Sequence, residues 1–535
     1  MRLCPKHKPG AYAAVMALVA VAALLLLRKP ELLNAYTYSD RIYDRNGQLL
    51  HLGLSLDDKY RIRVPLQEIP PVAREALLLY EDRWFYEHPG VNPASMLRAV
   101  WQMLTGGRRQ GASTLTMQVA RIVYHIDSSS VSGKLLQIVR ALQLEIFYSK
   151  DEILEAYFNL APYGGNIEGI AAAAQVWFNT PVSRLNLPQI LTLTVIPQNP
   201  VKRSPATPAG LKNAAAAAAR LKELWREKHP VSADDDLNLP LSSGRFLPHE
   251  APHAVRRLRE TARGKIAATL DENLQKQTEA ILSKYVKDNA GRGIFNAAAI
   301  LVDYKTAEVL AAVGSADFFN EKLDGQVDGT AALRSPGSAL KPFIYALALD
   351  QGLIHPRTML KDVPKNYGLY TPENFDRSFY GLVNATQALV YSRNIPAVDL
   401  LLRLEENSFY QMLEKAGVKK LKTPGYYGLA LALGGAEVSA QDLAALYAML
   451  GNGGKFRPLR WRKDEPQLPE TAMLSPEAAF LTLDMLSYNA PVDCRRLPFA
   501  KRSGTPYKVY WKTGTSYGYK DAWAAGLFGD FVLVV

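Results

Sequence analysis

Residues 334–343 read RSPGSALKPF and place Ser338 three positions before Lys341. At this spacing the two side chains lie on one face of a helix, and the Pro-Gly pair indicates where that helix begins. A lysine so placed can hold the serine hydroxyl and, if its charge is suppressed by neighbours, accept the hydroxyl proton. The S-x-x-K pattern is weak evidence by itself, so its meaning depends on the motifs that follow it.

Two further motifs follow in order, SRN at residues 392–394 and KTGTS at residues 512–516. Lys512 comes directly after the strand-like run at residues 507–511, and an edge strand of this kind can pair with a substrate peptide. Together, S-x-x-K, S-x-N and K-T-G predict a serine-based acyl-transfer site.

Two decoys have to be set aside. Residues 487–489 read SYN and repeat the S-x-N pattern, while residues 502–505 read RSGT and imitate the third motif. Neither combines the order and the preceding strand of the motifs chosen above, so we expect neither to belong to the site.

Length and composition limit the class of protein. The chain has 535 residues, enough for two or three domains with cores of their own. Apolar residues make up 48% and charged residues 21%, which argues against bulk disorder and against a multi-span membrane protein. The net charge of +12 favours an anionic partner such as nucleic acid, a phosphorylated substrate or a lipid surface. Two cysteines, Cys4 and Cys494, are too few for a disulfide framework or a four-ligand zinc site.

Residues 11–27 form an apolar run with basic residues on both sides. At about 1.5 Å per helical residue the run reaches about 25 Å, so it can span a bilayer if its flanking cations snorkel. A buried core helix is the poorer alternative because the run has no polar face, and a cleaved signal peptide lacks an A-x-A-like site. We expect residues 1–30 to form a cytoplasmic tail and an uncleaved transmembrane anchor, with the rest exported.

The exported part divides into a helical half and a mixed half. Residues 31–208 carry amphipathic patterns at 71–84 and 134–159, which predict a mainly α domain. Prolines and a polar stretch then indicate a linker region at 209–292.

The second half, residues 293–535, predicts an α/β (α+β) domain. A hairpin signal at 304–307 separates two apolar runs, helical segments follow, and strand-like runs return at 507–511, 522–528 and 531–535. Strands that enclose helices in this way predict a mainly antiparallel sheet flanked by helices. The last run ends while still strand-like, so we expect this domain to be truncated at its C-terminus.

The helical half contains two clusters of polar residues that could take part in catalysis or binding. Residues 81–90 read EDRWFYEHPG, and residues 111–118 read GASTLTMQ. Arg121 follows, and Lys134, Arg140 and Glu145 then lie along one long helical pattern. An exposed helix end could carry the first cluster alone, and each cation taken singly could lie on a solvated helix face.

These motifs resemble the peptidoglycan glycosyltransferase domain (glycosyltransferase family 51) of class A penicillin-binding proteins, over residues 42–205. Gln137 and Met117 replace a glutamate and a glutamine that are usual in the family, and both departures are similar to the 1C-type subgroup. The matching positions are Glu81, Asp82, Phe85, His88, Gly90, Gly111, Ser113, Thr114, Thr116, Gln118, Lys134, Ala141, Leu144 and Glu145.

The resemblance implies a mainly α, lysozyme-like domain that extends glycan strands from lipid II, a lipid-linked disaccharide pyrophosphate. It implies that Glu81 is the base for the acceptor hydroxyl, with Glu145 on the leaving-group side, where it orients cations or a divalent metal, Mg or Mn. Paired glutamates could also serve a glycoside hydrolase, which the carboxyl separation would decide. The substrate-binding residues implied are Asp82, Phe85, His88, Ser113, Thr114, Gln118 and three candidate phosphate contacts, Arg121, Lys134 and Arg140.

The other three motifs resemble the penicillin-binding transpeptidase domain from about residue 296 onward. The resemblance implies that Ser338 attacks the D-Ala-D-Ala carbonyl with Lys341 as base, and that β-lactams are captured at the same serine without a cofactor. It also implies that Ser392 relays a proton, that Asn394 holds the substrate amide and that Lys512 supports the electrostatics. Thr513, Gly514 and Thr515 are expected to bind substrate, and the Ser338 and Thr515 amides to form the oxyanion hole.

The order of anchor, glycosyltransferase, linker and transpeptidase predicts a bifunctional peptidoglycan synthase. We expect a single-pass protein of the bacterial inner membrane with its catalytic domains in the periplasm. Its expected partners are lipid II, nascent peptidoglycan, β-lactams and other cell-wall synthesis proteins, with no nucleic acid. Two alternatives stay open: a trimming enzyme with glycosidase and D,D-carboxypeptidase activities, and a non-catalytic β-lactam sensor.

Overall fold

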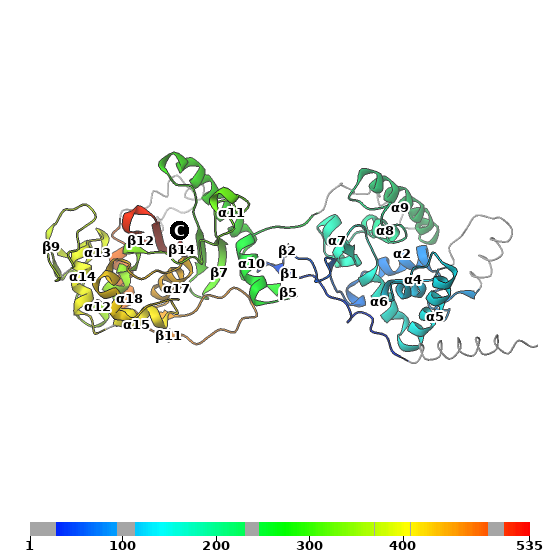
Figure 1. Cartoon of the computed structure of the whole chain (residues 1–535), viewed down its shortest axis with the longest axis horizontal. Helices are drawn as coiled ribbons and strands as arrows, with labels where there is room; N and C mark the ends of the chain where they lie inside the picture. The colour runs from blue at the N-terminus through cyan, green and yellow to red at the C-terminus, as the bar shows by residue number, and fades with distance from the viewer. Residues whose placement is uncertain (1–27, 94–112, 231–245, 369, 407, 490–507) are drawn as a thin grey trace, which may run out of the picture. The chain divides into compact units, whose positions relative to one another are not determined.

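The computed structural model describes residues 28–93, 113–230, 246–489 except 369 and 407, and 508–535 (Figure 1). The expected anchor at residues 11–27 lies outside these ranges. Among the helices that are described, none has the length and apolar character needed to cross a bilayer.

The chain forms two compact units. Leu52–Pro248 and the segment before Ile42 make the first, while Ile42–His51 and His249–Val535 make the second. The segment Ile42–His51 therefore packs with the second unit, although the sequence suggested that residues 31–208 form one continuous domain. The expected linker at 209–292 is also divided between the units.

The first unit is mainly helical. The pattern at residues 134–159 is two helices rather than one, because Ser149 starts a new helix with a capping box to Glu152. Two short parallel strands, β3 (Tyr60–Arg61) and β4 (Ile167–Glu168), accompany the helices. The helices are α2 (Pro71–Glu81), α4 (Leu115–Val123), α5 (Val131–Phe147), α6 (Lys150–Leu160), α7 (Ile170–Phe178), α8 (Leu187–Val195) and α9 (Pro208–Lys228), with 3₁₀ turns at Leu66–Glu68 and Val182–Arg184.

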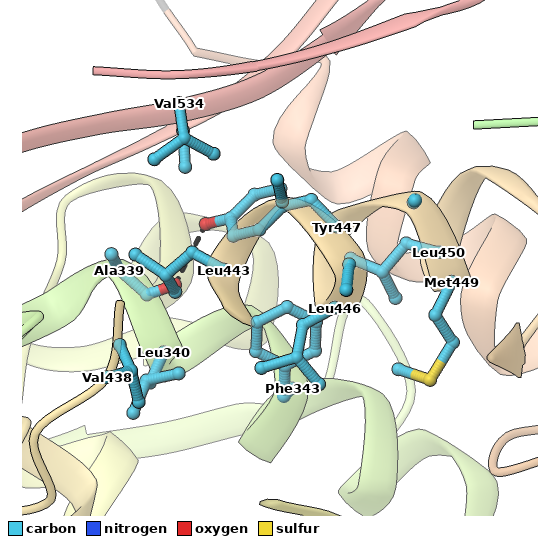
Figure 2. Close-up of a cluster of buried hydrophobic side chains, with 14 of the residues drawn as sticks. Ala339, Leu340, Phe343, Val438, Leu443, Leu446, Tyr447, Met449, Leu450 and Val534 are labelled. Atoms are coloured by element: carbon cyan, nitrogen blue, oxygen red, sulfur yellow. Dashed lines mark hydrogen bonds between the residues drawn. The ribbon is translucent and has the colours of Figure 1, made fainter. Parts of the chain in front are cut away.

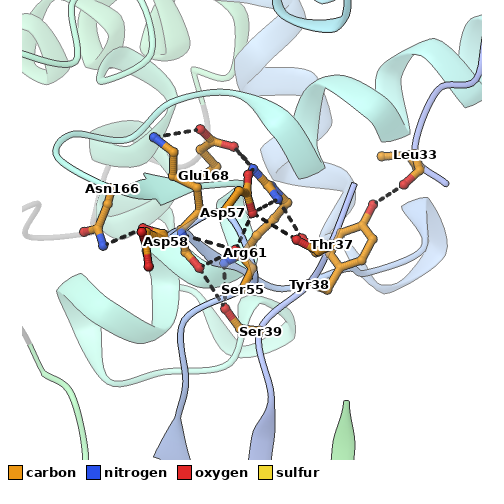
Figure 3. Close-up of polar contacts among 11 residues, drawn as sticks. Leu33, Thr37, Tyr38, Ser39, Ser55, Asp57, Asp58, Arg61, Asn166 and Glu168 are labelled. Carbon is orange, nitrogen blue, oxygen red and sulfur yellow. Dashed lines mark hydrogen bonds and ion pairs between the residues drawn. The ribbon is translucent and has the colours of Figure 1, made fainter. Parts of the chain in front are cut away.

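A buried arginine joins the connecting segments to this helical unit (Figure 3). Arg61 is 1% exposed, and its guanidinium donates to the Thr37 carbonyl at 2.6 Å, to Asp57 Oδ2 at 2.9 Å and from Nε to Glu168 Oε2 at 3.1 Å. Ser39 pairs with the Arg61 backbone through bonds of 2.8 and 3.0 Å. Thr37 precedes the segment that packs with the second unit, Asp57 follows that segment, and Glu168 lies on β4. The Arg61 guanidinium therefore holds the chain both where it leaves the helical unit and where it returns.

The second unit is built on a five-stranded sheet in which every neighbouring pair is antiparallel. The hairpin expected at residues 304–307 is present between its β6 and β7 strands. The K-T-G motif lies within the edge strand, where the sequence suggested that the strand ends just before it. The sheet order is β12 (Val509–Thr515), β13 (Ala522–Phe528), β14 (Phe531–Val534), β6 (Ala299–Asp303) and β7 (Glu308–Val313).

Helices and small sheets surround this sheet. The strands outside it are β1 (Arg41–Tyr43), β2 (Leu49–Leu52) and β5 (Lys265–Ala267) in one sheet, β8 (Met359–Asp362) with β9 (Gly381–Asn384), and β10 (Lys455–Phe456) with β11 (Thr471–Ala472). The helices are α10 (Pro252–Thr261), α11 (Glu272–Asn289), α12 (Lys341–Asp350), α13 (Ala385–Val390), α14 (Asn394–Arg403), α15 (Ser408–Lys415), α16 (Pro424–Tyr427), α17 (Ala440–Gly451) and α18 (Pro476–Leu486), and 3₁₀ turns occupy Ala290–Arg292, Glu321–Leu323, Gly337–Leu340, Gly428–Leu433 and Tyr517–Tyr519.

Helix α17 forms the centre of the core, between the sheet and the segment that carries Ser338 (Figure 2). It packs on β6, β13, β14 and α18, and most of its residues are buried, as expected for a helix that is apolar on every side. The Tyr447 ring meets Phe343 edge to face at 5.3 Å, and its hydroxyl donates to the Ala339 carbonyl at 2.8 Å. This contact fixes the turn next to Ser338 against the core.

The Arg61 cluster predicts a large loss of stability in Arg61→Met. The change leaves Glu168 without its buried cation, and breaking a buried pair of this kind costs about 3–5 kcal/mol. The calorimetric transition of the first unit should therefore move to a lower temperature. Lys59→Ala is the matched control, since Lys59 also pairs with Glu168 but at 3.4 Å and in a more exposed position, so it should cost less than about 1 kcal/mol. Equal, small losses in both variants would contradict this account of the cluster.

Candidate active sites

The turn that carries Ser338 approaches the edge strand more closely than side chains would allow. Gly337 has φ +52°, and a Cβ there would lie 2.2 Å from the Thr515 carbonyl oxygen. A Cβ on Gly514 would lie 2.0 Å from the Pro336 carbonyl oxygen. The glycines of both motifs are therefore required for the turn and strand β12 to touch.

Ser338 and Lys341 lie on a tighter helix than the sequence suggested. Residues Gly337–Leu340 form a 3₁₀ turn, and α12 begins only at Lys341. In a 3₁₀ helix the side chains at positions i and i+3 eclipse each other, so the two residues still share a face. Ser338 is half-buried, whereas Lys341 is 0% exposed.

The S-x-N motif lies at the junction of two helices. Helix α13 ends in a Schellman arrangement, in which the Ser392 amide donates to the Leu389 carbonyl at 3.1 Å and the Arg393 amide donates to the Ala388 carbonyl at 2.9 Å. Ser392 has φ +58°, a left-handed conformation that usually favours glycine at this place. Helix α14 then starts at Asn394.

The three motifs converge on two lysine amines. Lys341 Nζ donates to the Ser392 carbonyl at 2.7 Å and to Asn394 Oδ1 at 2.5 Å, and lies 3.5 Å from Ser392 Oγ. Lys512 Nζ donates to Ser392 Oγ at 2.8 Å and to the Thr513 carbonyl at 3.0 Å. The Ser392 hydroxyl therefore lies between the two amines. The structure thus brings the motifs together around one point.

Burial lowers the pKa of both lysine side chains. Burial, followed by the nearby cations Lys512 and Arg393, lowers the pKa of Lys341 well below its ordinary value. Burial also lowers the pKa of Lys512 to about 8. Both lysines therefore reach the neutral form at a lower pH than a solvated lysine does.

The other residues expected at this site lie on strand β12, where exposed and buried side chains alternate. Thr513 and Thr515 are exposed, while Gly514 between them is buried. The two hydroxyls are thus on the accessible face of an edge strand, as substrate contacts require. The decoy Ser487 instead closes the end of α18, where its hydroxyl donates to the Asp484 carbonyl at 2.6 Å. The decoy at residues 502–505 lies outside the described residues.

In the first unit, Glu81 is the last residue of α2 and its carboxyl is largely buried. Gln118 Nε2 donates to Glu81 Oε2 at 2.9 Å, and the buried Oε1 has no hydrogen-bond partner among the described residues. Burial raises the pKa of Glu81, while the Gln118 bond and then the charge of Arg203 oppose the rise. A buried carboxylate with one free oxygen suits a general base.

Asp82 and His88 are both buried, and they connect two segments of the first unit rather than face a substrate as exposed side chains. His88 Nδ1 accepts from the Gly90 amide at 3.2 Å, so its Nε2 is the nitrogen that donates to Asp82, at 3.0 Å. Asp82 Oδ2 also accepts from the Leu115 amide at 3.0 Å. The pair connects the end of α2 to the start of α4, which Thr114 caps.

Glu145 has partners that the sequence did not suggest. Its Oε1 accepts from the Thr116 hydroxyl at 2.6 Å and from Lys150 Nζ at 2.7 Å. Lys150 also donates to the His88 carbonyl at 2.6 Å and lies over the Phe85 ring at 4.6 Å. Glu145 thus helps to fix the loop after α2, and Lys150 is the cation beside it.

The three cations expected as phosphate contacts do not surround Glu145. Lys134 Nζ donates to Ser113 Oγ at 2.6 Å and to Gln137 Oε1 at 2.8 Å. Burial, and then the charge of Arg121, lowers the pKa of Lys134. Arg140 lies over the Tyr124 ring at 4.3 Å. Lys134 and Arg121 therefore form a separate positive region.

Three residues at these sites were missed from the sequence. Lys150 resembles an ordinary first-turn residue after the Ser149 cap, and its contact with Glu145 depends on how α5 meets α6. Arg203 acts on Glu81 through space, and its Nη1 donates to the Val195 carbonyl at 2.6 Å. Asp362 lies between the first two transpeptidase motifs in sequence and belongs to none of the three. None of these residues carries a local signal.

The described residues near Glu145 do not fit a divalent metal. A magnesium or manganese site requires several oxygen ligands, mostly carboxylates and water. Within the described ranges no group of three or more His, Cys, Asp or Glu side chains gathers. Glu145 is instead engaged by an ammonium and a hydroxyl, so no step is assigned to a metal here.

Comparison with known families agrees with this geometry. Residues 46–227 match the family model described as Transglycosylase, and residues 297–528 match the Penicillin binding protein transpeptidase domain. The chain belongs to the penicillin-binding proteins that carry both domains. The two-domain prediction from the motifs is therefore confirmed.

Individual relatives support the same assignment. The chain is 38% identical over 497 residues to penicillin-binding protein 1C of Escherichia coli (strain K12), covering 91% of this chain and 63% of that protein. It is 30% identical over 479 residues to penicillin-binding protein 1F of Bacillus subtilis (strain 168), covering 83% and 64%. The chain thus spans less than two thirds of the length of these relatives. The crystal structure of penicillin-binding protein 1A from Haemophilus influenzae shares the fold, with a TM-score of 0.52 and 17% identity over 95% of this chain and 88% of that one.

The left-handed Ser392 predicts a difference between two variants that both lack its hydroxyl. An L-residue in this conformation carries a strain of about 1–2 kcal/mol that glycine does not have, partly offset by the greater freedom of glycine in the unfolded chain. Ser392→Gly should therefore be more stable than Ser392→Ala by about 1 kcal/mol in chemical denaturation. Both should lose acylation by a β-lactam, because both remove the group between the two amines. Equal stability of the pair would argue against backbone strain at Ser392.

Proposed function

We propose that this chain is a peptidoglycan synthase whose first unit polymerises lipid II and whose second unit cross-links stem peptides. The observation that carries the proposal is the convergence of three motifs on one hydroxyl, with Lys512 Nζ at 2.8 Å and Lys341 Nζ at 3.5 Å from Ser392 Oγ. A buried amine with lowered pKa beside a serine turn and an edge strand suits serine acyl transfer.

In the acylation step, Ser338 Oγ attacks the carbonyl carbon of the penultimate D-alanine while its proton passes to the neutral Lys341 amine. The amides of Ser338 and Thr515 receive the developing oxyanion. The C–N bond then breaks, and the leaving D-alanine takes a proton relayed through Ser392. The acyl-enzyme that results is an ester on Ser338.

The ester is resolved by the amine of a neighbouring stem peptide, which forms a new amide bond and returns the proton to Ser338. Edge strand β12 offers the substrate backbone a partner, Asn394 holds its amide, and Thr513 and Thr515 contact the terminal carboxylate. A β-lactam follows the first step only, since its opened ring stays attached and no leaving group departs.

In the first unit, Glu81 removes the proton from the acceptor sugar hydroxyl, which then attacks the anomeric carbon of the lipid-linked donor. The C–O bond to the pyrophosphate breaks, and the positive charge of Lys134 and Arg121, in their region separate from Glu145, stabilises the departing pyrophosphate. We assign this chemistry to a lysozyme-like helical domain. Lipid II, nascent glycan and other cell-wall synthesis proteins are the proposed partners.

The proposed location is the bacterial inner membrane, with both units in the periplasm. The support for this placement is the apolar run at residues 11–27 with cations on both sides. A lipid-linked substrate also requires an enzyme held at the membrane surface.

Acylation by benzylpenicillin should show a bell-shaped dependence on pH. On the acid side the rate falls as Lys341 gains the proton that prevents it from acting as base, and this limb lies well below the ordinary lysine range because its pKa is lowered. On the alkaline side the rate falls near pH 8, where Lys512 loses its charge.

Two variants check this interpretation. Lys512→Arg keeps its charge at every working pH, so it should abolish the alkaline limb, and Ser338→Ala should abolish labelling. Labelling of the wild type without a limb near pH 8 would contradict the role of Lys512. Release of free D-alanine in place of cross-links would favour the trimming enzyme, and acylation without cross-links or released D-alanine would favour the sensor.

Polymerisation of lipid II should depend on Glu81 in its ionised form. Because burial raises the pKa of Glu81, the acid limb of polymerisation should lie above the value of about 4.3 for an ordinary glutamate. Gln118→Leu removes the bond that opposes the rise and should move this limb to higher pH still. Glu81→Gln should lower the rate by about 10²–10⁴-fold. Polymerisation at the wild-type rate in Glu81→Gln would overturn the assignment of the base.

A further inference from the structure

The middle residue of the S-x-N motif makes a buried ion pair that the mechanism above does not use. Arg393 is 3% exposed and Asp362, the last residue of β8, is 0% exposed. Arg393 Nε donates to Asp362 Oδ2 at 2.7 Å, and Nη1 donates to Asp376 Oδ2 at 2.9 Å. Its third nitrogen, Nη2, donates to the Ser378 carbonyl, and its Cζ lies 4.1 Å from the centroid of the Tyr380 ring.

The same carboxylate also reaches Asn394 through a second route. Asp362 Oδ1 accepts from Asn374 Nδ2 at 2.8 Å, and Asn374 Oδ1 accepts from the Asn394 amide at 2.7 Å. Asn394 Nδ2 donates to the Glu373 carbonyl at 2.6 Å. Because both ends of Asn394 are fixed in this way, its Oδ1 is aimed at the Lys341 amine, 2.5 Å away.

We propose that Arg393 and Asp362 are positioning residues that hold Ser392 and Asn394 around the Lys341 amine and balance the charge behind it. Neither residue touches substrate. Arg393 acts through the backbone that it shares with its two neighbours, and Asp362 acts through Arg393 and Asn374. This inference rests on the proposed acyl-transfer function of the second unit.

The charges that face Lys341 among the described residues come from three elements. Lys512 lies on β12, Arg393 precedes α14 and Asp362 ends β8. Lys512 and Arg393 lower the pKa of Lys341 and Asp362 raises it, all in addition to burial. Removing one member of the ion pair should therefore shift this pKa in one direction, and removing the other should shift it in the opposite direction.

A purely structural ion pair would behave differently. Breaking a buried pair destabilises a protein whichever partner is removed, because a buried charge is left uncompensated. Such a loss has the same sign for both partners. The sign of the pH shift therefore separates a role in tuning Lys341 from a role in folding alone.

The test measures the rate of acylation of the full chain by benzylpenicillin across pH. In Arg393→Gln the midpoint of the acid limb should rise by about one pH unit, since Asp362 is then uncompensated. In Asp362→Asn the midpoint should fall by about as much. The double variant Asp362→Asn/Arg393→Gln removes both charges and should return the midpoint close to that of the wild type.

Two further variants serve as controls. Asp376→Asn removes the exposed partner of Arg393, with a side chain 42% exposed, and should leave the midpoint unchanged. Arg393→Lys keeps the charge but loses the forked contacts, so the midpoint should stay while the maximal rate falls at least tenfold. If Arg393→Gln or Asp362→Asn does not fold, Arg393→Lys still decides the positioning role, since a wild-type rate there would overturn it.

The outcomes separate this inference from the function on which it rests. A wild type that benzylpenicillin acylates, with Arg393→Gln and Asp362→Asn both losing rate at an unmoved midpoint, would overturn the role of the pair. Shifts of the same sign in Arg393→Gln and Asp362→Asn would do the same. A wild type that is not acylated at any pH would overturn the proposed transpeptidase function, and this inference with it.

Discussion

The buried amine of Lys341 is the constraint on which the second unit depends. An ammonium group that loses its water must either find compensating partners or give up its proton. The groups that contact this amine are neutral oxygens, namely the Ser392 carbonyl, the Asn394 amide oxygen and, at 3.5 Å, the Ser392 hydroxyl, while Lys512 and Arg393 add positive charge nearby. The site therefore favours the neutral amine, which is the form that can accept a proton from Ser338. The close approach of β12 and the bond from α17 to the turn beside Ser338 hold this arrangement in place.

In the first unit, burial acts in the same way on a group of opposite charge, the Glu81 carboxylate. Burial raises the pKa of Glu81 and lowers that of Lys341, and in both cases the neutral form gains. The consequences for catalysis converge, because a carboxylate with a raised pKa is a stronger base and a lysine with a lowered pKa is available as a base. In the mechanism proposed above, burial is thus the largest effect that prepares each of the two groups to act as a base. Gln118 moderates the effect at Glu81 with one neutral bond.

Local patterns in the sequence predicted local structure well. The β6–β7 hairpin follows from turn chemistry, whereas the two-domain order and the meeting of the three transpeptidase motifs follow from the resemblance of the motifs to known families. Contacts between segments far apart in the chain were not predictable. The segment Ile42–His51, for example, joins the second unit through the pairing of β1 with β5. The contact of Glu145 with Lys150 is close in sequence but depends on how α5 meets α6 at the Ser149 cap, which the helical pattern does not show. Asp362 has no sequence signal at all, since its role arises only when β8 is placed behind α14.

The conformation of Ser392 shows how these effects combine at one residue. A Schellman turn favours glycine at this position, yet the site requires a hydroxyl between two amines, so local preference and function conflict. Strain of this kind persists only where the surroundings determine the backbone more strongly than the residue itself does. Arg393 follows the strained residue directly, and its buried pair with Asp362 fixes the chain on that side of Ser392. The position of the Ser392 hydroxyl is therefore set by an ion pair that lies outside the reacting groups, which explains why a costly buried charge pair is placed next to a catalytic motif.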